Sequence, residues 1–258
     1  MTPDSSPEPT PATLLSVRDL TVRFGAVTGV RDVSLDVPAG RITGVLGANG
    51  AGKTTTLLGI LGRVPRESGT VVLDGRDVTD LGTVELVKAG IALCPENRRL
   101  FPNMSVEDNL LLGAFGTGRR VEQTRLAEVY DRFGWVRERR RELAGRLSGG
   151  QQQTVAIARS LMSAPSLLML DEPSSGLSPV AIEEVRVLLE RISADGTAVL
   201  LVEQNVKLVQ ELCETAVVLA HGHVKDSGLV TDLLSGARVA DAYLGGLAVT
   251  DEAPLERP

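Results

Sequence analysis

Apolar and polar residues alternate along the first part of the chain, as they do in strands that bury one face. The alternation runs through residues 15–24 and again through 33–37, which predicts two strands. Residues 41–46 form a short strand-like run that leads into a glycine-rich loop, and residues 54–61 are predicted to form a helix. A second hairpin-like pair is expected around 69–78. The N-terminal part is therefore predicted to be mainly strands.

The segment from about 103 to 160 has a different pattern and is predicted to be helical. Apolar residues recur there at positions i, i+3, i+4 and i+7, namely at Leu126, Val129, Tyr130 and Phe133. Together with its linker, this helical subdomain is expected to span about 97–160.

The remainder of the chain alternates between two kinds of segment. Apolar runs of strand length lie at 167–170, 198–202 and 216–219, and helical stretches lie between them at 179–192 and 205–214. This alternation implies parallel strands whose crossover helices cover both faces of a sheet. The fold class is therefore predicted to be α/β, with a mainly parallel sheet, an N-terminal antiparallel β subdomain and an inserted α-helical subdomain.

Length and charge limit what this chain can be. Its 258 residues suffice for one large domain or two small ones. Basic residues number 27 and acidic residues 33, so the formal net charge is −6. That balance disfavours a general nucleic-acid surface, which must be basic to neutralise phosphates. Aromatic residues make up only 3% of the chain, so stacking platforms for single strands have few candidates.

Neither a membrane span nor a metal framework is indicated. No apolar run reaches the roughly 18–20 residues that cross a bilayer. Cys94 and Cys213 lie far apart and are interpreted as small apolar fillers. Residues 1–13 are rich in Pro, Ser and Thr and lack the pattern of a signal peptide, which predicts a disordered tail. We expect a soluble protein on the cytosolic side of the system it serves.

The strongest chemical signal is the segment GANGAGKT at 47–54, between a predicted strand and a predicted helix. It fits the pattern GxxxxGK[ST], in which glycines let backbone N–H groups surround a phosphate at a helix N-terminus. Lys53 is expected to pair with the β- and γ-phosphates, and the Thr54 hydroxyl to bind Mg²⁺. The predicted ATP-binding residues here are Gly47, Ala48, Asn49, Gly50, Ala51, Gly52, Lys53, Thr54 and Thr55.

Two carboxylates follow the apolar run at 167–170. They are expected at the carboxyl edge of the sheet, where open α/β sheets bind ligands. Asp171 is predicted to hold Mg²⁺ through water, and Glu172 to polarise the attacking water. The alternative is a strand with a solvated acidic end, a reading that the phosphate-loop motif makes much weaker.

A second anion site is predicted at LSGGQ, residues 147–151, where Ser148 is the expected N-cap of a helix. The Ser148 hydroxyl and the N–H groups of the following glycines are expected to bind an anion at this helix N-terminus. Such a site is sensible if it serves the γ-phosphate bound by another subunit. Standing alone, the motif would be better read as a glycine-containing helix cap.

These three motifs, in this order and spacing, resemble the ATP-binding subunit of ABC transporters over about residues 14–246, with a further tail at 247–258. The resemblance implies a P-loop NTPase core and a head-to-tail dimer that sandwiches two ATP. Each ATP would lie between the phosphate loop of one chain and the signature residues of the other, which are Ser148, Gly149, Gly150 and Gln151. ATP binding would close the dimer, and hydrolysis would open it and drive permease subunits.

Finer motifs resemble the LivF-type subunit of branched-chain amino acid importers: PENRRLFPNMSVEDNL at 95–110, LVEQN at 201–205 and AYLGG at 242–246. The related urea-importer ATPases are close competitors. The implied partners are membrane permease subunits, a second ATPase subunit that is homologous or identical, and indirectly a solute-binding protein, but no nucleic acid. The implied location is the cytoplasmic face of the plasma membrane.

Four further positions acquire roles through this resemblance. Glu96 stands where most members have a Gln near Mg²⁺ and the attacking water, and Gln204 where most have a His that contacts the γ-phosphate. A Gln cannot titrate near neutral pH, so a His-based proton role is unavailable. Ser178 replaces a residue of the dimer contact. Phe24 stands at the position of the aromatic that stacks on adenine, the alternative being a core Phe.

Two other functions remain open from the sequence. One is a non-transport ABC protein that acts as a nucleotide-switched binding module, for which the chain lacks both a long coiled-coil insertion and a second cassette. The other is a subunit that binds ATP with little hydrolysis, which Glu96, Gln204 and Ser178 motivate. The leading hypothesis is an ABC importer ATPase that uses ATP and Mg²⁺ and couples hydrolysis to amino acid uptake. Glu172 would be the catalytic base, and the Gln204 amide would donate to the γ-phosphate.

Overall fold

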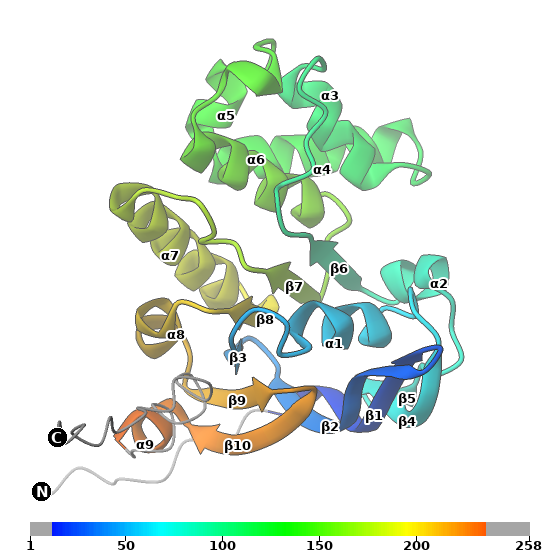
Figure 1. Cartoon of the computed structure of the whole chain (residues 1–258). Helices are drawn as coiled ribbons and strands as arrows, with labels where there is room; N and C mark the ends of the chain where they lie inside the picture. The colour runs from blue at the N-terminus through cyan, green and yellow to red at the C-terminus, as the bar shows by residue number, and fades with distance from the viewer. Residues whose placement is uncertain (1–11, 236–258) are drawn as a thin grey trace, which may run out of the picture.

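The computed structural model describes residues 12–235, which form a six-stranded sheet, a four-stranded sheet and a lobe of helices (Figure 1). The larger sheet has the order β10-β9-β3-β8-β7-β6. Its pairs are parallel except for β9 with β10. Its strands are β3 (Ile42–Leu46), β6 (Ile91–Cys94), β7 (Leu167–Asp171), β8 (Ala198–Glu203), β9 (Thr215–Ala220) and β10 (His223–Leu229). The predicted α/β class with a mainly parallel sheet is confirmed.

The smaller sheet is antiparallel and has the order β2-β1-β4-β5. Its strands are β1 (Thr13–Phe24), β2 (Val27–Pro38), β4 (Arg66–Leu73) and β5 (Arg76–Asp77). The predicted tail at 1–13 is one residue too long, because Thr13 already pairs with Pro38 and the Ala39 N–H donates to the Ala12 carbonyl. Residues 1–11 of that predicted tail, the expected domain end at 246 and the segment 247–258 lie outside the described residues.

The helices fall into two groups (Figure 1). Those that flank the sheets are α1 (Lys53–Ile60), α2 (Thr83–Lys88), α7 (Pro179–Ala194), α8 (Val206–Leu212) and α9 (Val230–Ser235). The helical lobe, at the top of Figure 1, contains α3 (Val106–Leu111), η1 (Leu112–Ala114), α4 (Arg119–Arg132), α5 (Gly134–Glu138), η2 (Ala144–Arg146) and α6 (Gly149–Leu161). Helix α4 ends one residue before Phe133, whose ring is nevertheless buried in the core. None of the described helices is long and apolar enough to cross a membrane.

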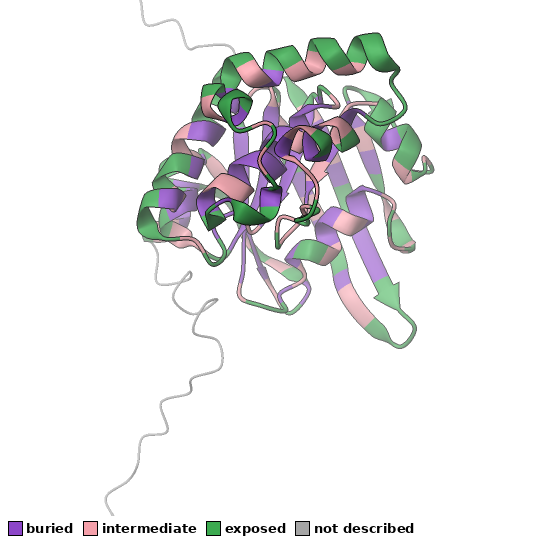
Figure 2. Cartoon of the chain, turned by 90° about the horizontal axis from the view of Figure 1, so that it is seen from above, coloured by how far each residue is buried: buried purple, intermediate pink, exposed green. Residues whose placement is uncertain are grey.

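The central strands are apolar on both faces because each face packs against a different core. Leu168 and Leu170 of β7 belong to the core shared with α6, α7 and the helical lobe. Leu167 and Met169 belong to the core shared with α1 and the antiparallel sheet. Figure 2 shows the buried residues concentrated in these strands. Burial on both faces explains why β7 and β8 appear as continuous apolar runs in the sequence.

Strand order brings the predicted chemistry to one edge of the larger sheet. β3, β8, β7 and β6 are neighbours and run parallel, so their carboxyl ends share that edge. The phosphate loop (residues 47–54) follows β3, Gln204 follows β8, Asp171 ends β7, and Glu96 lies two residues beyond β6. This is where open α/β sheets place their ligand sites.

Candidate active site

The phosphate loop owes its shape to two glycines that no other residue could replace without rearrangement. Gly52 has φ 105°, and a Cβ there would lie 2.5 Å from Cγ1 of Val30. A Cβ on Gly47 would lie 2.7 Å from the Leu219 carbonyl oxygen. The loop is also anchored from outside, because the Gly222 N–H donates to the Ala51 carbonyl over 2.9 Å. The close approach of three segments therefore fixes the loop at the start of α1, whose N-terminal N–H groups suit an anion.

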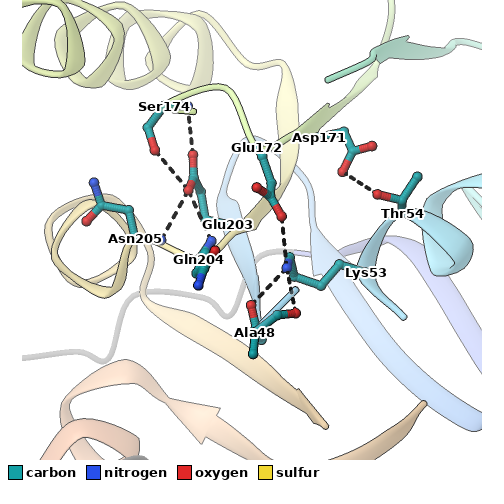
Figure 3. A network of polar contacts seen from close by, with 10 residues as sticks. Ala48, Lys53, Thr54, Asp171, Glu172, Ser174, Glu203, Gln204 and Asn205 are labelled. Carbon is teal, nitrogen blue, oxygen red and sulfur yellow. Dashed lines mark hydrogen bonds and ion pairs between the residues drawn. The ribbon is translucent and has the colours of Figure 1, made fainter. Parts of the chain in front are cut away.

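The Lys53 ammonium lies inside this loop and joins it to β7 (Figure 3). Its Nζ donates to the carbonyls of Gly47 and Ala48 over 2.8 and 3.0 Å. It also forms an ion pair with Oε1 of Glu172 at 2.9 Å. Because the Lys53 side chain is only 4% exposed, this pair is largely shielded from water. Lys53 and Glu172, from separate motifs, are thus brought into direct contact.

A second contact joins the same two motifs. The Thr54 hydroxyl donates to Oδ1 of Asp171 over 3.0 Å (Figure 3). Burial raises the pKa of Asp171, and the negative charges of Glu172 and Glu96 raise it further, while the bond from Thr54 and the charge of Lys53 oppose the rise. Glu96 lies two residues beyond β6, at the same edge of the sheet. A cation bound at this point would relieve the crowding of negative charge.

Thr54 and Asp171 fit a magnesium ion that is shared with a phosphate. In residues 12–235, no group of three or more His, Cys, Asp or Glu side chains is arranged to hold a metal. Mg²⁺ is commonly held by one or two carboxylates together with substrate phosphates and water, and it prefers oxygen ligands. The Thr54 hydroxyl and the Asp171 carboxylate, next to the phosphate loop, supply such oxygen ligands.

The backbone of Glu172 is unusual, with φ 46° in the left-handed region. Its N–H donates to the Val202 carbonyl and its carbonyl accepts from the Ser175 N–H. These bonds hold the residue in a turn that directs its side chain to Lys53 (Figure 3). A non-glycine residue held in this region is a feature often found at functional sites.

Glu203, at the end of β8, is a site residue that sequence reasoning missed. It is only 2% exposed. Its Oε1 accepts from the Ser174 N–H over 2.9 Å, and its Oε2 accepts from the Ser174 hydroxyl and the N–H groups of Gln204 and Asn205 over 3.0, 3.1 and 3.2 Å. Burial raises the pKa of Glu203, and these bonds oppose the rise. The carboxylate ties the loop after Glu172 to Gln204 (Figure 3).

The signature residues lie on the helical lobe, at the start of α6. Ser148 is the N-cap, as predicted: its Oγ accepts from the Gln151 N–H over 3.3 Å, and the Gln151 side chain accepts from the Ser148 N–H over 3.1 Å. Ser148 and Gly149 are exposed, whereas Gly150 is buried against Ala181. Among the described residues, the polar partners of Lys53 and Asp171 include none of these four.

Comparison with known proteins decides the family. Residues 30–175 match the ABC transporter family, which is more than half of the chain. The chain belongs to the ABC transporter family. It is 38% identical to the high-affinity branched-chain amino acid transport ATP-binding protein BraG of Pseudomonas aeruginosa, over 90% of this chain and 100% of BraG. It is 32% identical to the lipopolysaccharide export system ATP-binding protein LptB of Escherichia coli, over 90% and 97% of the two chains.

Solved structures agree on the fold. A nucleotide-free ATP-binding cassette from an ABC transporter superposes with a TM-score of 0.83 and 24% identity, covering 89% of this chain and 98% of that one. The mixed sheets and helices of this chain are therefore those of the cassette fold. Together, the family match and the similarity to BraG make it an ABC ATPase.

Phe24, Gln204 and Ser178 lie at the end of β1, directly after β8 and directly before α7. Phe24 ends β1, and 48% of its surface is exposed. Its ring and the Thr55 methyl group both lie next to Gly29, 3.0 and 2.9 Å from where a Cβ on that glycine would be. Gln204 is exposed directly after β8. Ser178 is the N-cap of α7 and accepts from the Ala181 N–H over 3.4 Å, so this replacement retains a capping side chain.

Proposed function

We propose that this chain is the ATP-hydrolysing subunit of an ABC importer for branched-chain amino acids, and that ATP-driven closure of a cassette dimer powers the permease subunits. The observation that carries the proposal is the pair of contacts Lys53–Glu172 and Thr54–Asp171. They bring an ammonium, a hydroxyl and two carboxylates together at one edge of the sheet. Hydrolysis of a phosphoanhydride needs these groups together.

Nucleotide binding would begin at the phosphate loop. The loop N–H groups and Lys53 would bind the β- and γ-phosphates, with Lys53 turning from Glu172 to the phosphate oxygens. The half-exposed ring of Phe24, beside Thr55 at the start of α1, offers a face on which adenine can stack. The residues Gly47 to Thr55 and Phe24 would thus hold the whole nucleotide.

Thr54, Asp171 and Glu96 would hold Mg²⁺ beside the phosphates. When bound, the ion supplies positive charge that offsets the charge developing on the phosphate oxygens. Burial raises the pKa of Asp171, so its carboxylate is less stable there than in water, and a bound cation would offset that cost. Glu96 would offer a further carboxylate oxygen to the ion.

Glu172 would act as the general base. It accepts a proton from water as the water oxygen bonds to the γ-phosphorus, and the bond from that phosphorus to the β–γ bridging oxygen breaks. Gln204 would donate an amide hydrogen bond to the γ-phosphate and orient the water. Glu203 holds both loops at the required spacing through the bonds described above.

The signature residues Ser148, Gly149, Gly150 and Gln151 would complete the site of a second cassette. Ser148 and Gly149 are exposed at the N-terminus of α6 and have no polar contact with Lys53 or Asp171 of their own chain. They would therefore bind the γ-phosphate held by the partner, whether identical or homologous. A dimer of this kind places half of each active site on each chain.

The choice of solute rests on similarity. BraG, a branched-chain amino acid transport protein, is 38% identical, whereas LptB, a lipopolysaccharide export protein, is 32% identical. The ATPase would sit at the cytoplasmic face of the plasma membrane, held by the permease, and would act only indirectly with a solute-binding protein. A urea or amide importer is the second candidate, because its ATPases share the motifs that contain Glu96 and Gln204.

A nucleotide switch with little hydrolysis is the third candidate. Glu96, Gln204 and Ser178 depart from the general pattern and motivate it. Against it stands Glu172, whose carboxylate is 16% exposed and contacts the phosphate-binding Lys53. A phosphate-release rate no higher than that of Glu172→Gln would favour this candidate.

Mixing two inactive variants tests the shared active site. Lys53→Ala removes the phosphate contact and leaves the signature. Ser148→Asp keeps a good N-cap but sets a negative charge against the γ-phosphate. Each variant alone should be inactive, and an equal mixture should regain about a quarter of the wild-type sites, because half of random dimers are mixed and each has one intact site. No recovery from two folded variants would contradict assembly of the site from two copies of this chain.

Uptake measurements test the solute. In the organism that carries the gene, replacing Glu172 with Gln should abolish high-affinity uptake of labelled leucine and leave urea uptake unchanged. The reverse result would support the urea or amide importer.

A further inference from the structure

Three successive residues between Glu96 and the helical lobe have left-handed backbones. The φ angles of Asn97, Arg98 and Arg99 are 60°, 62° and 46°. Residues with a Cβ seldom enter this region, and a run of three is costly because Cβ crowds the following carbonyl. Strain of this kind persists only where the surroundings hold it in place. The segment 97–99 carries the chain from Glu96 towards α3 and the helical lobe (Figure 1).

Arg159, near the end of α6, holds this segment. Its guanidinium donates to the carbonyls of Arg99 and Arg98 over 2.8 Å each. In residues 12–235 no carboxylate lies within 4.0 Å of the Arg159 guanidinium as an ion-pair partner. Within the described part of the chain, this half-buried cation donates instead to the two carbonyls of the strained segment. Bonds from a charged donor are stronger than neutral ones.

The segment is also attached to the beginning of α6. Arg98 reaches back, and its guanidinium donates to Oε1 of Gln152 over 3.4 Å. The same group lies 3.5 Å from where a Cβ on Gly149 would be, beside the exposed signature residues. The loop is therefore fastened to both ends of one helix, by Arg98 at the start and Arg159 at the end. A displacement of segment 97–99 is therefore expected to displace α6 as well.

We propose that Arg159 is a positioning residue that fixes Glu96 relative to the signature residues on α6 and so couples the two ATP sites of the dimer. The proposal rests on the function proposed above, in which Glu96 serves the ATP of its own chain and Ser148 to Gln151 serve that of the partner. A shift of Glu96 towards its own Mg²⁺ and phosphate is transmitted through segment 97–99 to α6. ATP at one site thereby favours the closed form of the other.

The variant Arg159→Gln tests this coupling. It removes the charged pair of donors, so segment 97–99 should relax and Glu96 should lose its position. We expect kcat for ATP hydrolysis to fall about tenfold, within the range for a misplaced catalytic group, and the Hill coefficient for ATP to fall towards one. Affinity of the isolated chain for a fluorescent ATP analogue should be unchanged. Arg99→Gln is the matched control, because it changes an exposed arginine of the same segment and keeps both carbonyl bonds.

Glycine rescue separates positioning from a merely structural role. In Arg159→Gln, the further changes Asn97→Gly and Arg99→Gly supply residues that adopt positive φ without strain. The triple variant should recover most of the lost kcat and cooperativity. If Arg159→Gln does not fold, Arg159→Lys, which can still donate to a carbonyl, takes its place and should show an intermediate loss with the same rescue.

Two results would overturn the proposal. One is wild-type kcat and Hill coefficient in Arg159→Gln, and the other is a loss in folded protein that the glycines do not repair. Glu172→Gln distinguishes this failure from failure of the proposed function. If Glu172→Gln is inactive while Arg159→Gln matches the wild type, hydrolysis stands and only the coupling is wrong. If Glu172→Gln stays active, the proposed function itself is wrong.

Discussion

Nζ of Lys53 lies 2.9 Å from Oε1 of Glu172, so a single ion pair joins the phosphate loop to the acidic end of β7. Both side chains are largely shielded from solvent, because only 4% of Lys53 and 16% of Glu172 is exposed. The pair keeps the Lys53 ammonium, the proposed phosphate-binding group, beside Glu172, the proposed base. In the proposed reaction each turns to a new partner, Lys53 to phosphate and Glu172 to water.

Replacing Lys53 with Ala should weaken ATP binding about 10- to 100-fold, because hydrogen bonds from a charged group contribute about 1.5–3 kcal/mol and each 1.4 kcal/mol is tenfold. Titration with a fluorescent ATP analogue measures the change. Lys207→Ala is the control, because that lysine is 82% exposed on α8. Equal affinities for the two variants would exclude Lys53 from the phosphate site.

Asp171→Asn should stabilise the chain while abolishing Mg²⁺-dependent hydrolysis. Because burial raises the pKa of Asp171, the carboxylate lowers stability once the pH rises through that raised value. An Asn still accepts from Thr54 without this cost. Thermal unfolding without metal should show a higher Tm for the variant at neutral pH, by about 2–4 °C per kcal/mol. The difference should shrink as the pH falls towards the ordinary value of 3.8. A variant that is less stable at neutral pH would contradict the assignment.

Glu203→Gln should impair both stability and turnover. The amide keeps one acceptor oxygen, but its NH₂ group replaces the second oxygen, which now accepts hydrogen bonds. The buried N–H groups that donate to that oxygen would lose their partner. We expect the free energy of unfolding in urea to fall by about 1–3 kcal/mol and kcat to fall more than KM changes. Ser174→Ala, which loses only the hydroxyl donor, should show a smaller effect on both. Equal kcat in wild type and Glu203→Gln would remove Glu203 from the site.

Two N-cap serines allow the signature to be tested apart from stability. Ser148 caps α6 and Ser105 caps α3, each by accepting from an N–H three residues on. Replacing either with Ala should cost about 0.5–2 kcal/mol of stability. Only Ser148→Ala should also lower ATP hydrolysis, measured at saturating ATP. A similar loss of activity in Ser105→Ala would indicate that the cap, not the anion site, matters.

The site residues that stand in short motifs were predictable from the sequence. Lys53 and Thr54 stand in a loop with the glycine spacing of GxxxxGK[ST]. Asp171 and Glu172 follow a continuous apolar run of strand length. Ser148 was predictable as an N-cap because Gln151 follows three residues later, which completes a capping box. In each case the chemistry is local, so the sequence pattern carries it.

Glu203 and Arg159 were not predictable in this way. The role of Glu203 depends on β8 lying between β3 and β7, which brings Ser174 within hydrogen-bond distance of Glu203. Arg159 acts on carbonyls some 60 residues earlier in the chain, and backbone acceptors leave no trace in a sequence. The start of β1 was misplaced for a related reason, since Thr13 is ordered by pairing with Pro38 and not by its own composition.

The most direct test of the hydrolytic site is the variant Glu172→Gln. It preserves the shape of the side chain but removes the base, so phosphate release should fall at least a hundredfold, the lower range for loss of a general base. ATP binding, measured in parallel on the same preparation, should remain at least as tight as in the wild type. Phosphate release at the wild-type rate from folded Glu172→Gln would contradict the assignment of Glu172 as the general base.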